Sequence, residues 1–589
     1  MDYRLLIKGG TVVDGTGAPA YAADVRIADG RIAEVGPELQ SGRGERVVDA
    51  TGCYVTPGFI EMHNHWDGGV WWTPNMDPLP GYGATTSING DCGFSLAPAP
   101  RGEAEKQNVI DIFNFFEDIP EEPMRKLVPW DWQSWSEYKA SMVRNVSLLL
   151  NYAAFCGHIA LRLCVMGQDC WQRAATGPEI DRMCAMLEDA LAAGAMGLSS
   201  NFLDYDKYDR PLPSQLADDA ELAALLAVIA RYPRATFQVI VDHFMRKTGN
   251  NVVERLASLS AQAGVRMQWI GMPIIEYQAD QLPRAQVLHQ QFKDQGLEIY
   301  SSFLVISFTS VINFSRTLVF AQNGNPVWQE LTDLSTWAEK AAWLADPEWR
   351  ARARRSWDNQ FDHSYLHDPS ALTLRDSETG FGPTGITLAD YMRENGFGHA
   401  SDALAEWVLN NGQESVLLKK SWALDEDTLV ALLHDSHTLA NVSDASAHGK
   451  LFCGAGYSIF VLTEFVRDRK VLSIEQGVHM LTGRHTGFFG LHDRGAIEVG
   501  RVADITVFNL DEIEMRPEKK IWDVPDGTAR TYRYTRDPAP MRLTLVNGIP
   551  TFDKAEFAGR YPGEFIGPEA ARAQDGLSHR LPASHLETA

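Results

Sequence analysis

The sequence predicts an α/β fold in which a (β/α)8 barrel carries a small β-sandwich domain built from both chain ends. Strand-like runs alternate with helical patterns through the middle of the chain, as a parallel barrel requires. Short strand-and-turn patterns occupy both ends of the chain. At 589 residues the chain also exceeds the size at which one hydrophobic core stops growing, so a large and a smaller domain are expected.

The amino-terminal segment reads as short strands. The runs at 25–28 and 31–35 flank Asp29-Gly30, a two-residue turn in which both residue types tolerate positive φ. This segment is too small to bury a core of its own, and similar strand-and-turn patterns recur at 500–508 and 543–550. We therefore expect residues 1–55 and 497–555 to form one small β-sandwich domain.

The middle of the chain, 56–496, carries the alternating pattern of the TIM-type barrel. A helical pattern such as 218–230, rich in Ala, Leu and Glu, lies between most of the strand candidates. The eight predicted strands are at 58–63, 83–89, 147–155, 195–199, 235–241, 266–270, 297–304 and 438–443.

Two segments fall outside the repeating pattern. Residues 306–437 are too many for one crossover and indicate an inserted subdomain, whose tryptophans we expect in its core: Trp328, Trp337, Trp343, Trp349, Trp357, Trp407 and Trp422. Residues 556–589 form a C-terminal tail that becomes Ala-, Pro- and Gly-rich, and we expect it to be mobile or wrapped on the surface.

Composition narrows the classes of partner. The net charge is −24 without a long basic run, which argues against nucleic acid and against an anionic membrane surface. No apolar stretch has membrane-spanning length, and the first residues lack the apolar core of a signal peptide. The seven cysteines suit a reducing compartment, so we predict a cytoplasmic protein. A homo-oligomer is compatible with these properties.

A His-x-His pattern ends the first predicted barrel strand. Side chains at i and i+2 of a strand point to the same side, so His63 and His65 can present their imidazoles to one metal ion. The alternative interpretation is two unrelated polar residues at a strand end.

Further metal-binding residue types follow other strands. Cys92 closes the second predicted strand and Asp444 closes the last. Catalytic groups of a parallel barrel gather at the carboxyl ends of its strands. Each residue alone has a structural interpretation, an inert core cysteine or a turn aspartate. Their coincidence with His63 and His65 favours a metal site.

These motifs resemble a known family. Pro-Gly-Phe-Ile-Glu-Met-His-Asn-His at 57–65, with Arg-Gly-Ala-Ile-Glu-Val-Gly-Arg-Val-Ala-Asp-Ile at 494–505, resembles the amidohydrolase superfamily. The finer resemblance is to its D-aminoacylase (N-acyl-D-amino-acid deacylase) branch. It rests on Thr-Thr at 85–86, Asn-Gly-Asp-Cys-Gly at 89–93, Gly-His-Ile-Ala-Leu-Arg at 157–162, Gly-Ala-Met-Gly-Leu-Ser-Ser at 194–200, Ser-Asp at 443–444 and His-Gly-Lys at 448–450. It covers nearly the whole chain outside 306–437.

The resemblance implies a cofactor and roles for several residues. It implies Zn2+, or another divalent transition metal, with His63, His65, Cys92 and Asp444 as ligands or near-ligands. It also gives Asp444 the role of general base and acid for a metal-activated water that attacks the acyl carbonyl.

The resemblance implies two substrate-binding residues as well. His158 resembles a pocket residue of the family. Lys450 stands where the family has an arginine for the substrate carboxylate, and lysine pairs with a carboxylate as a point charge. Trp66, Trp71 and Trp72 follow the metal strand directly, and Trp66 in particular is a candidate for an apolar substrate wall.

The departures from the family pattern bear on the metal site. The family places histidines in strands five and six, but this chain has Gln238 and Gly271 there. Asp242 and His243 lie just beyond strand five and are candidate replacements, although a solvated loop is the simpler interpretation of His243. The fourth predicted strand offers no lysine, which argues against a lysine-bridged binuclear centre.

His63, His65 and Asp444 by themselves supply the three protein ligands usual for a catalytic zinc, with Cys92 as a fourth group. We therefore expect a single-metal site, in which Asp444 acts either as ligand or as base.

Three functions follow from the sequence. The leading prediction is a metal-dependent hydrolase of C–N bonds, similar to N-acyl-D-amino-acid deacylases, acting on a small acylated amine or amino acid. The tryptophans after the first strand motivate an alternative substrate: a lactone, a cyclic amide or a bulky apolar amide. The missing histidines motivate a third, a catalytically silent relative.

Overall fold

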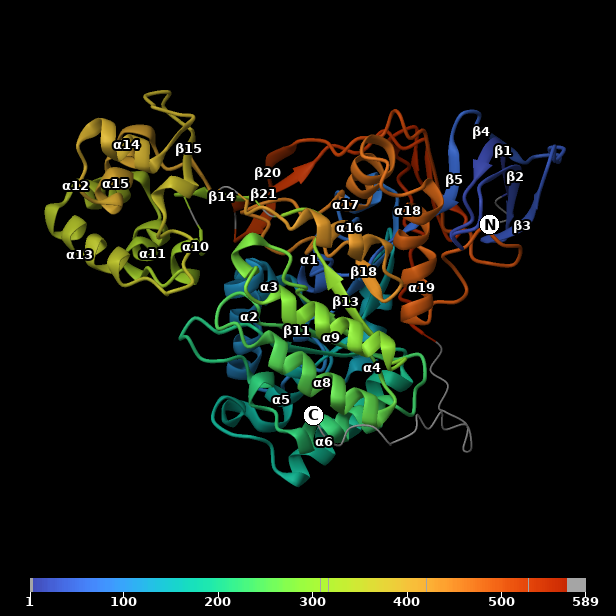
Figure 1. The fold of residues 1–589 in the computed structure, drawn as a ribbon, viewed down its shortest axis with the longest axis horizontal. Coiled ribbons are helices and arrows are strands. Elements are labelled where there is room, and N and C mark those ends of the chain that lie inside the picture. The colour runs from blue at the N-terminus through green and yellow to red at the C-terminus, as the bar shows by residue number, and fades with distance from the viewer. Residues whose placement is uncertain (1–3, 308, 316, 420, 528, 569–589) are drawn as a thin grey trace.

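The computed structural model describes residues 4–307, 309–315, 317–419, 421–527 and 529–568. Figure 1 shows the inserted helices α10 to α15 at one end of the long axis and strands β1 to β5 at the other. Parallel strands and their covering helices lie between and below these two ends. The chain is an α/β protein with parallel sheets.

Strands from both ends of the chain share one sheet. Its path runs β24-β23-β22-β19-β5-β1-β2-β3, and β4 pairs with β1. One buried apolar cluster contains side chains of both ends, among them Leu5 and Ile505. The strands are β1 (Arg4–Val12), β2 (Tyr21–Ala28), β3 (Arg31–Gly36), β4 (Arg46–Asp49), β5 (Tyr54–Pro57), β19 (Ile505–Phe508), β22 (Leu543–Val546), β23 (Ile549–Asp553) and β24 (Glu556–Phe557).

The predicted turn at Asp29-Gly30 is confirmed. Strands β2 and β3 pair antiparallel, with Ala28 opposite Arg31. Asp29 has φ 53° and Gly30 has φ 75°, the conformation that a two-residue hairpin turn of this type needs.

One segment within 497–555 takes a different course. Strands β20 (Glu518–Asp526) and β21 (Ala529–Arg536) form a separate two-stranded hairpin outside the nine-stranded sheet. Helix α3 (Glu121–Leu127) contacts β20. The hairpin therefore packs on α3 and lies outside the terminal sheet.

The predicted barrel strands form two parallel sheets. One sheet has the order β6-β7-β8 and the other β18-β13-β12-β11-β10-β9. Only Phe155 separates β8 from β9 along the chain. The strands are β6 (Phe59–Glu61), β7 (Ala84–Asn89), β8 (Asn151–Ala154), β9 (Cys156–Gly157), β10 (Gly197–Phe202), β11 (Thr236–Val241), β12 (Arg266–Ile270), β13 (Ile299–Phe303) and β18 (Thr438–Ala440).

Helices connect these strands. Helix α7 (Asp219–Ile229) confirms the helix predicted at 218–230, and the Asp218 side chain caps it by accepting the Glu221 N–H. The other helices outside the insertion are α1 (Trp66–Gly69), α2 (Glu103–Glu117), α4 (Trp135–Asn145), α5 (His158–Met166), α6 (Gly177–Ala192), α8 (Gly249–Ala263), α9 (Leu282–Asp294), α17 (Tyr457–Phe460), α18 (Ile474–Leu481) and α19 (Gly483–Phe489). Helix α16 (Glu426–His434) lies within 306–437 but contacts β18.

The insertion has its own sheet and apolar cluster. Trp328, Trp349, Trp357 and Trp407 are buried together in that cluster, whereas Trp422 lines a cavity. Its strands are β14 (Ser310–Asn313), β15 (Leu372–Asp376), β16 (Ile386–Thr387) and β17 (Val416–Lys419). Its helices are α10 (Val319–Gln322), α11 (Pro326–Asp333), α12 (Trp337–Ala345), α13 (Pro347–Asp358), α14 (Leu388–Asn395) and α15 (Ala400–Asn411).

The start of the predicted tail is anchored. Phe565 is buried beside Trp135 and Tyr152, with ring centroids at 5.5 and 5.2 Å. The expectation for 569–589 lies outside the described residues. Among the helices of the described residues, none is long and apolar enough to cross a membrane.

Candidate metal centre

The His-x-His pair lies directly beyond β6. The backbone N–H of His65 donates to the carbonyl of Ala445 at 3.0 Å, which ties this turn to the segment after β18. Asn64 donates from its side chain to the Glu61 carbonyl at 2.9 Å, so the residue between the two histidines is fixed as well. His63 and His65 are each 1% exposed. Both imidazoles are therefore buried, and the backbone that carries them is tied to neighbouring segments.

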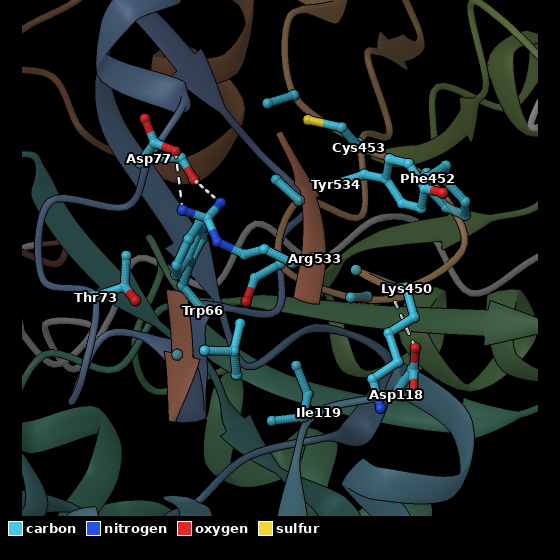
Figure 2. A pocket seen from close by; sticks show the side chains of 18 of the residues that line it. Trp66, Thr73, Asp77, Asp118, Ile119, Lys450, Phe452, Cys453, Arg533 and Tyr534 are labelled. Atoms are coloured by element: carbon cyan, nitrogen blue, oxygen red, sulfur yellow. Dashed lines mark hydrogen bonds and ion pairs between the residues drawn. The ribbon is translucent and has the colours of Figure 1, made fainter. Parts of the chain in front are cut away.

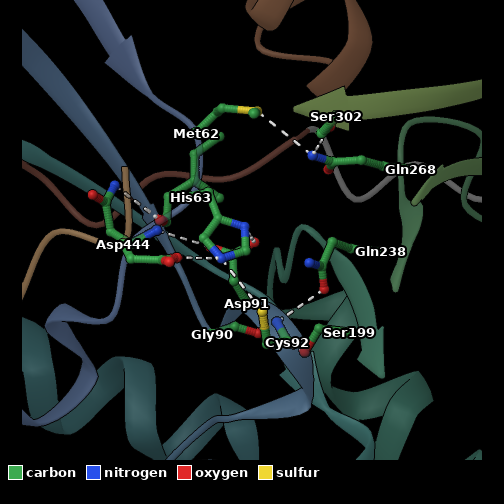
Figure 3. Close-up of polar contacts among 12 residues, drawn as sticks. Met62, His63, Gly90, Asp91, Cys92, Ser199, Gln238, Gln268, Ser302 and Asp444 are labelled. Carbon is green, nitrogen blue, oxygen red and sulfur yellow. Dashed lines mark hydrogen bonds and ion pairs between the residues drawn. The ribbon is translucent and has the colours of Figure 1, made fainter. Parts of the chain in front are cut away.

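Cys92 sits in a tight turn after β7. It has φ 54°, and its N–H donates to the side-chain oxygen of Gln238 on β11 at 3.1 Å. A side chain on the preceding Gly90 would collide with the Phe155 carbonyl, so this approach needs glycine. The turn places Cys92 Sγ 3.3 Å from His63 Nε2 (Figure 3).

Asp444 faces both histidines from the segment after β18. Its Oδ1 lies 2.9 Å from His63 Nε2 and 3.8 Å from His65 Nε2. Figure 3 shows the carboxylate directed at the His63 ring. Burial acts to raise the pKa of Asp444, but the hydrogen bond and charge of His63 and the charge of His65 outweigh it and lower the pKa to about 2. Asp444 is therefore ionised at neutral pH.

Three of these side chains meet the geometric condition for a shared ion. One donor atom from each of His63, His65 and Cys92 lies within 4.8 Å of the others, and all three residues are buried. Burial lowers the pKa of His65 to about 3, helped by the charge of His63, so its imidazole is neutral with a free lone pair. Nitrogen and thiolate donors are the set that zinc favours.

Acidic and imidazole groups missed by the sequence analysis surround these donors. Asp91 Oδ1 lies 3.8 Å from His63 Nδ1, where a carboxylate can orient the ring. Glu117, the last residue of α2, has Oε1 3.7 Å from His65 Nε2 and Oε2 3.8 Å from His448 Nε2. Burial, then the charge of Asp444, raises the pKa of Glu117 well above its usual value.

These additional groups carried only a faint signal in the sequence. Glu117 follows an apolar helical run, where an ionisable residue is unusual, but nothing local indicates which cavity it faces. His448 was visible as part of the motif at 448–450 without an assigned role.

Asp242 and His243, the candidate metal ligands beyond β11, are hydrogen-bonded to nearby residues of the chain. Asp242 accepts backbone N–H bonds from Phe244, Met245 and Arg246 at 2.6–2.9 Å. His243 Nε2 lies 3.0 Å from the Asn250 side-chain oxygen. Among the described residues, the only group meeting the metal geometry remains His63, His65 and Cys92.

His158 occupies a fully buried polar cluster. Its Nδ1 lies 2.8 Å from Ser200 Oγ on β10, and its Nε2 lies 2.8 Å from Glu221 Oε1 on α7. Arg162 forms an ion pair with the second oxygen of Glu221. Both ring nitrogens of His158 are thus occupied by protein partners, and it is not among the described residues that line the cavities.

A cavity of about 380 Å3 opens in front of these candidate ligands. His63, His65, Cys92 and Asp444 form part of its wall. Much of the remainder is apolar, contributed by Ile240, Phe244, Met245, Ile270, Met272, Ile274, Ile275, Phe303, Leu304, Trp422 and Val442. This is the size and character of a site for a small organic molecule.

Trp66 and Lys450 line a different, smaller cavity (Figure 2). Its volume is about 60 Å3, room for a few water molecules. The Lys450 N–H donates to Asp118 at 3.3 Å, and Arg533 of β21 pairs with Asp77 at 2.9 Å. The structure therefore separates these two predicted substrate residues from the larger cavity.

The other tryptophans after β6 do not gather at the larger cavity either. Trp71 stacks on Trp132 with ring centroids at 5.5 Å, and Trp72 lines the smaller cavity. The apolar wall expected from these indoles is instead supplied by Trp422 of the insertion and by the residues after β11, β12 and β13.

A carboxylate facing buried nitrogen and sulfur donors, at the carboxyl ends of parallel strands, is an arrangement typical of metal-dependent hydrolases. The chain belongs to the amidohydrolase family, whose profile matches residues 46–378 and 389–552. This match confirms the resemblance drawn from the sequence motifs and the prediction of an amidohydrolase.

Relatives with assigned activities align along almost the whole chain. The N-acyl-D-glutamate deacylase of Alcaligenes xylosoxydans xylosoxydans is 26% identical, over 97% of each chain. The D-aminoacylase of the same organism is 25% identical, over 97% of this chain and 98% of that one. The D-aminoacylase branch suspected from the sequence is thus the branch to which these relatives belong.

Two solved structures share the fold. A D-aminoacylase studied for its binuclear metal center superposes with a TM-score of 0.63 at 21% identity, over 96% of this chain and 99% of that one. The N-acyl-D-glutamate deacylase of Bordetella bronchiseptica, complexed with zinc and a phosphonate inhibitor, gives 0.61 at 23% identity, over 96% and 100%.

Proposed function

We propose that this protein hydrolyses the amide bond of an N-acylated amino acid, in the manner of an N-acyl-D-amino-acid deacylase, with a single metal ion held by His63, His65 and Cys92. The observation that carries the proposal is the convergence of these donors and an ionised Asp444 on one wall of a cavity of about 380 Å3. The relatives act on N-acyl-D-glutamate and on other D-aminoacyl compounds by name, which supports the same substrate class here.

The residues present fit a metal. The Nδ1 atoms of His63 and His65 are buried without a hydrogen-bond partner in the described structure, so neither imidazole is consumed by a structural bond on that side. A divalent metal such as Zn2+ would supply Lewis acidity, making water more acidic and polarising the scissile carbonyl. Burial and nearby carboxylates raise the pKa of Cys92 well above its usual value, so the thiol would give up its proton only to a cation that stabilises the thiolate.

Asp444 is the group that moves the proton. Its carboxylate is ionised, hydrogen-bonded to His63, and its side chain retains 18% exposure toward the cavity. It accepts a proton from the attacking water and returns it to the departing amine nitrogen. Asp91 lies behind the His63 ring, with its Oδ1 3.8 Å from Nδ1.

The scaffold supports the same proposal. We infer that the two parallel sheets are arcs of one (β/α)8 barrel. Ile60 of β6, Ile88 of β7 and Ala153 of β8 share a buried cluster with Ile270 of β12 and Leu439 of β18. An isolated parallel bridge between residues 64 and 445 lies just beyond the ends of β6 and β18.

We also propose the domain division that the sequence indicated. It comprises a β-sandwich from 1–55 and 497–555, a barrel from 56–496 interrupted at about 306–437, and a tail from 556 onward. The hairpin of β20 and β21 lies outside the terminal sheet, and β24 at the start of the tail belongs to that sheet. Separate buried clusters in the terminal sheet and in the insertion support it. The seven cysteines are all unpaired, which supports a reducing compartment such as the cytoplasm.

A second candidate function has an observation in its favour. The apolar walls of the larger cavity would also accept a bulky amide, cyclic amide or lactone without a carboxylate. A substrate panel of N-acyl-D-amino acids, N-acyl-L-amino acids, hydantoins and lactones separates the two candidates.

The test pairs that panel with variants and metal analysis. We expect zinc-loaded protein to prefer N-acyl-D-amino acids, and Asp444→Ala to lose activity by a factor on the order of 10² to 10⁴ while keeping bound metal. His63→Ala is expected to lose both. His434→Ala, at an exposed site on α16, is the control. Full activity in both Asp444→Ala and His63→Ala would contradict the proposal. Wild-type protein that binds metal but hydrolyses no member of the panel would indicate a catalytically silent relative.

A further inference from the structure

The larger cavity receives one basic side chain from the insertion. Lys419, the last residue of β17, lines it together with Trp422 and Tyr365. Among the described residues that line this cavity, Lys419 is the only lysine or arginine. The lining also includes three acidic side chains, Glu117, Asp204 and Asp444.

The amine of Lys419 has an unusual environment for a cation. The residue is 3% exposed, and its Nζ lies 3.1 Å from the ring centroid of Trp422 and 5.9 Å from that of Tyr365. No carboxylate of the described chain is within ion-pair distance of it. Among the described residues its close partners are aromatic faces, and cation–π contacts replace just part of the hydration that an ammonium has in water. Burial lowers the pKa of Lys419 to about 8.

An anion entering the cavity would compensate for this loss of hydration. The metal-binding wall and Lys419 border the same space, and the surface between them is largely apolar. We propose that Lys419 binds the carboxylate of the substrate and that the apolar wall takes its side chain or acyl chain. The substrate class is then an N-acyl amino acid with a large apolar group. This inference rests on the proposed function.

Lys419 then takes the carboxylate-binding role that the sequence motif had suggested for Lys450. That residue matched the carboxylate-binding position of the family by motif. In the structure it lines the smaller cavity and is not among the described residues that line the cavity bordered by His63, His65 and Cys92. Lys419 lies in the insertion at 306–437, outside the segments that carry the family motifs.

Binding of two matched probes to the zinc-loaded full-length chain tests the proposal. N-methanesulfonyl-D-phenylalanine carries the carboxylate, and N-methanesulfonyl-D-phenylalaninol replaces it with an alcohol; the sulfonamide of both resists hydrolysis. We expect Lys419→Met to weaken calorimetric binding of the acid by roughly tenfold or more, and of the alcohol by less than about twofold. Lys520→Met, on the hairpin near the insertion, is the matched control.

The pH dependence supplies a readout that a structural role would not produce. Affinity of the wild-type protein for the acid should fall above about pH 8, where Lys419 loses its proton, while affinity for the alcohol stays level. Lys419→Arg should keep the affinity and lose the alkaline fall, since guanidinium stays charged.

Several results would overturn the proposal. These are equal losses for both probes in Lys419→Met, a loss confined to Lys450→Met, or no binding of the acid to the wild-type chain. If the acid binds through Lys419 but no N-acyl amino acid is hydrolysed, the subsite stands and the proposed function fails. If hydrolysis occurs with Lys419→Met unimpaired, the proposed function stands and the subsite fails.

Discussion

The buried cluster of His158, Arg162 and Glu221 should stabilise the packing of α5 against the rest of the protein through an ionised carboxylate. Glu221 on α7 accepts from His158 and pairs with Arg162, and all three side chains have no exposure. Burial acts to raise the pKa of Glu221, but the hydrogen bond and charge of His158 and the charge of Arg162 lower it from 4.5 to about 2. At ~1.4 kcal/mol for each factor of ten in acidity, the ionised carboxylate is stabilised by about 3 kcal/mol.

Glu221→Gln removes this charge while keeping the shape of the side chain. It leaves the Arg162 guanidinium buried without its counter-ion, and losses of ~3–5 kcal/mol are typical of such half-broken pairs. We therefore expect α5 and α7 to open more easily by about 3 kcal/mol. Hydrogen exchange of peptides covering 158–166 and 219–229 should then accelerate by roughly 100-fold at pH 7.

The matched control is Glu179→Gln. Glu179 also pairs with an arginine, Arg173, but the two side chains are 17% and 39% exposed. Solvent screening reduces such a pair to ~0–1 kcal/mol, so we expect little change in exchange there.

The pH dependence has a definite sign. Because the pKa of Glu221 is depressed in the folded state, its stabilisation is complete above the unfolded value of about 4.5 and is lost as the pH falls toward about 2. The difference between wild type and Glu221→Gln should therefore shrink below pH 4.5. Unchanged exchange with a raised KM would refute the reasoning and return His158 to substrate binding.

Two further predictions concern the turn that carries Cys92 and the insertion. Gln238→Leu removes the acceptor of the Cys92 N–H and should weaken zinc affinity by ~10–100-fold in chelator competition. Gln268→Leu, in register with it on β12 but without a bond to Cys92, should change affinity far less; equal losses would contradict the prediction. Trp328→Ala should destabilise the insertion by ~3–5 kcal/mol in urea unfolding at unchanged metal content, whereas Trp522→Ala, at 53% exposure, should not.

Much of the scaffold was predictable because its signals are local. Strand periodicity located the parallel strands, and Asp29-Gly30 fixed a hairpin through backbone conformation alone. The convergence of His63, Cys92 and Asp444 was predictable for a topological reason, since residues after different parallel strands meet at the same edge.

The rest of the site depends on side-chain direction and on distant packing. Trp66 begins a short helix, and its indole points into the smaller cavity, which no local pattern indicates. Glu117 approaches His65 from the end of a helix. Lys419 belongs to the insertion, and the sequence does not indicate that this part of the insertion lines the larger cavity. His158 follows its strand as expected, but its partners lie on β10 and α7.

X-ray absorption at the zinc edge tests the central claim most directly, namely that His63, His65 and Cys92 hold the metal. We predict one zinc per chain, with one sulfur scatterer at about 2.3 Å and nitrogen or oxygen scatterers at about 2.0–2.1 Å. In Cys92→Ser the sulfur contribution should vanish, and in His65→Ala the bound zinc should be lost on dialysis. A sulfur-free spectrum of the wild-type protein, or full zinc retention in both variants, would contradict the account.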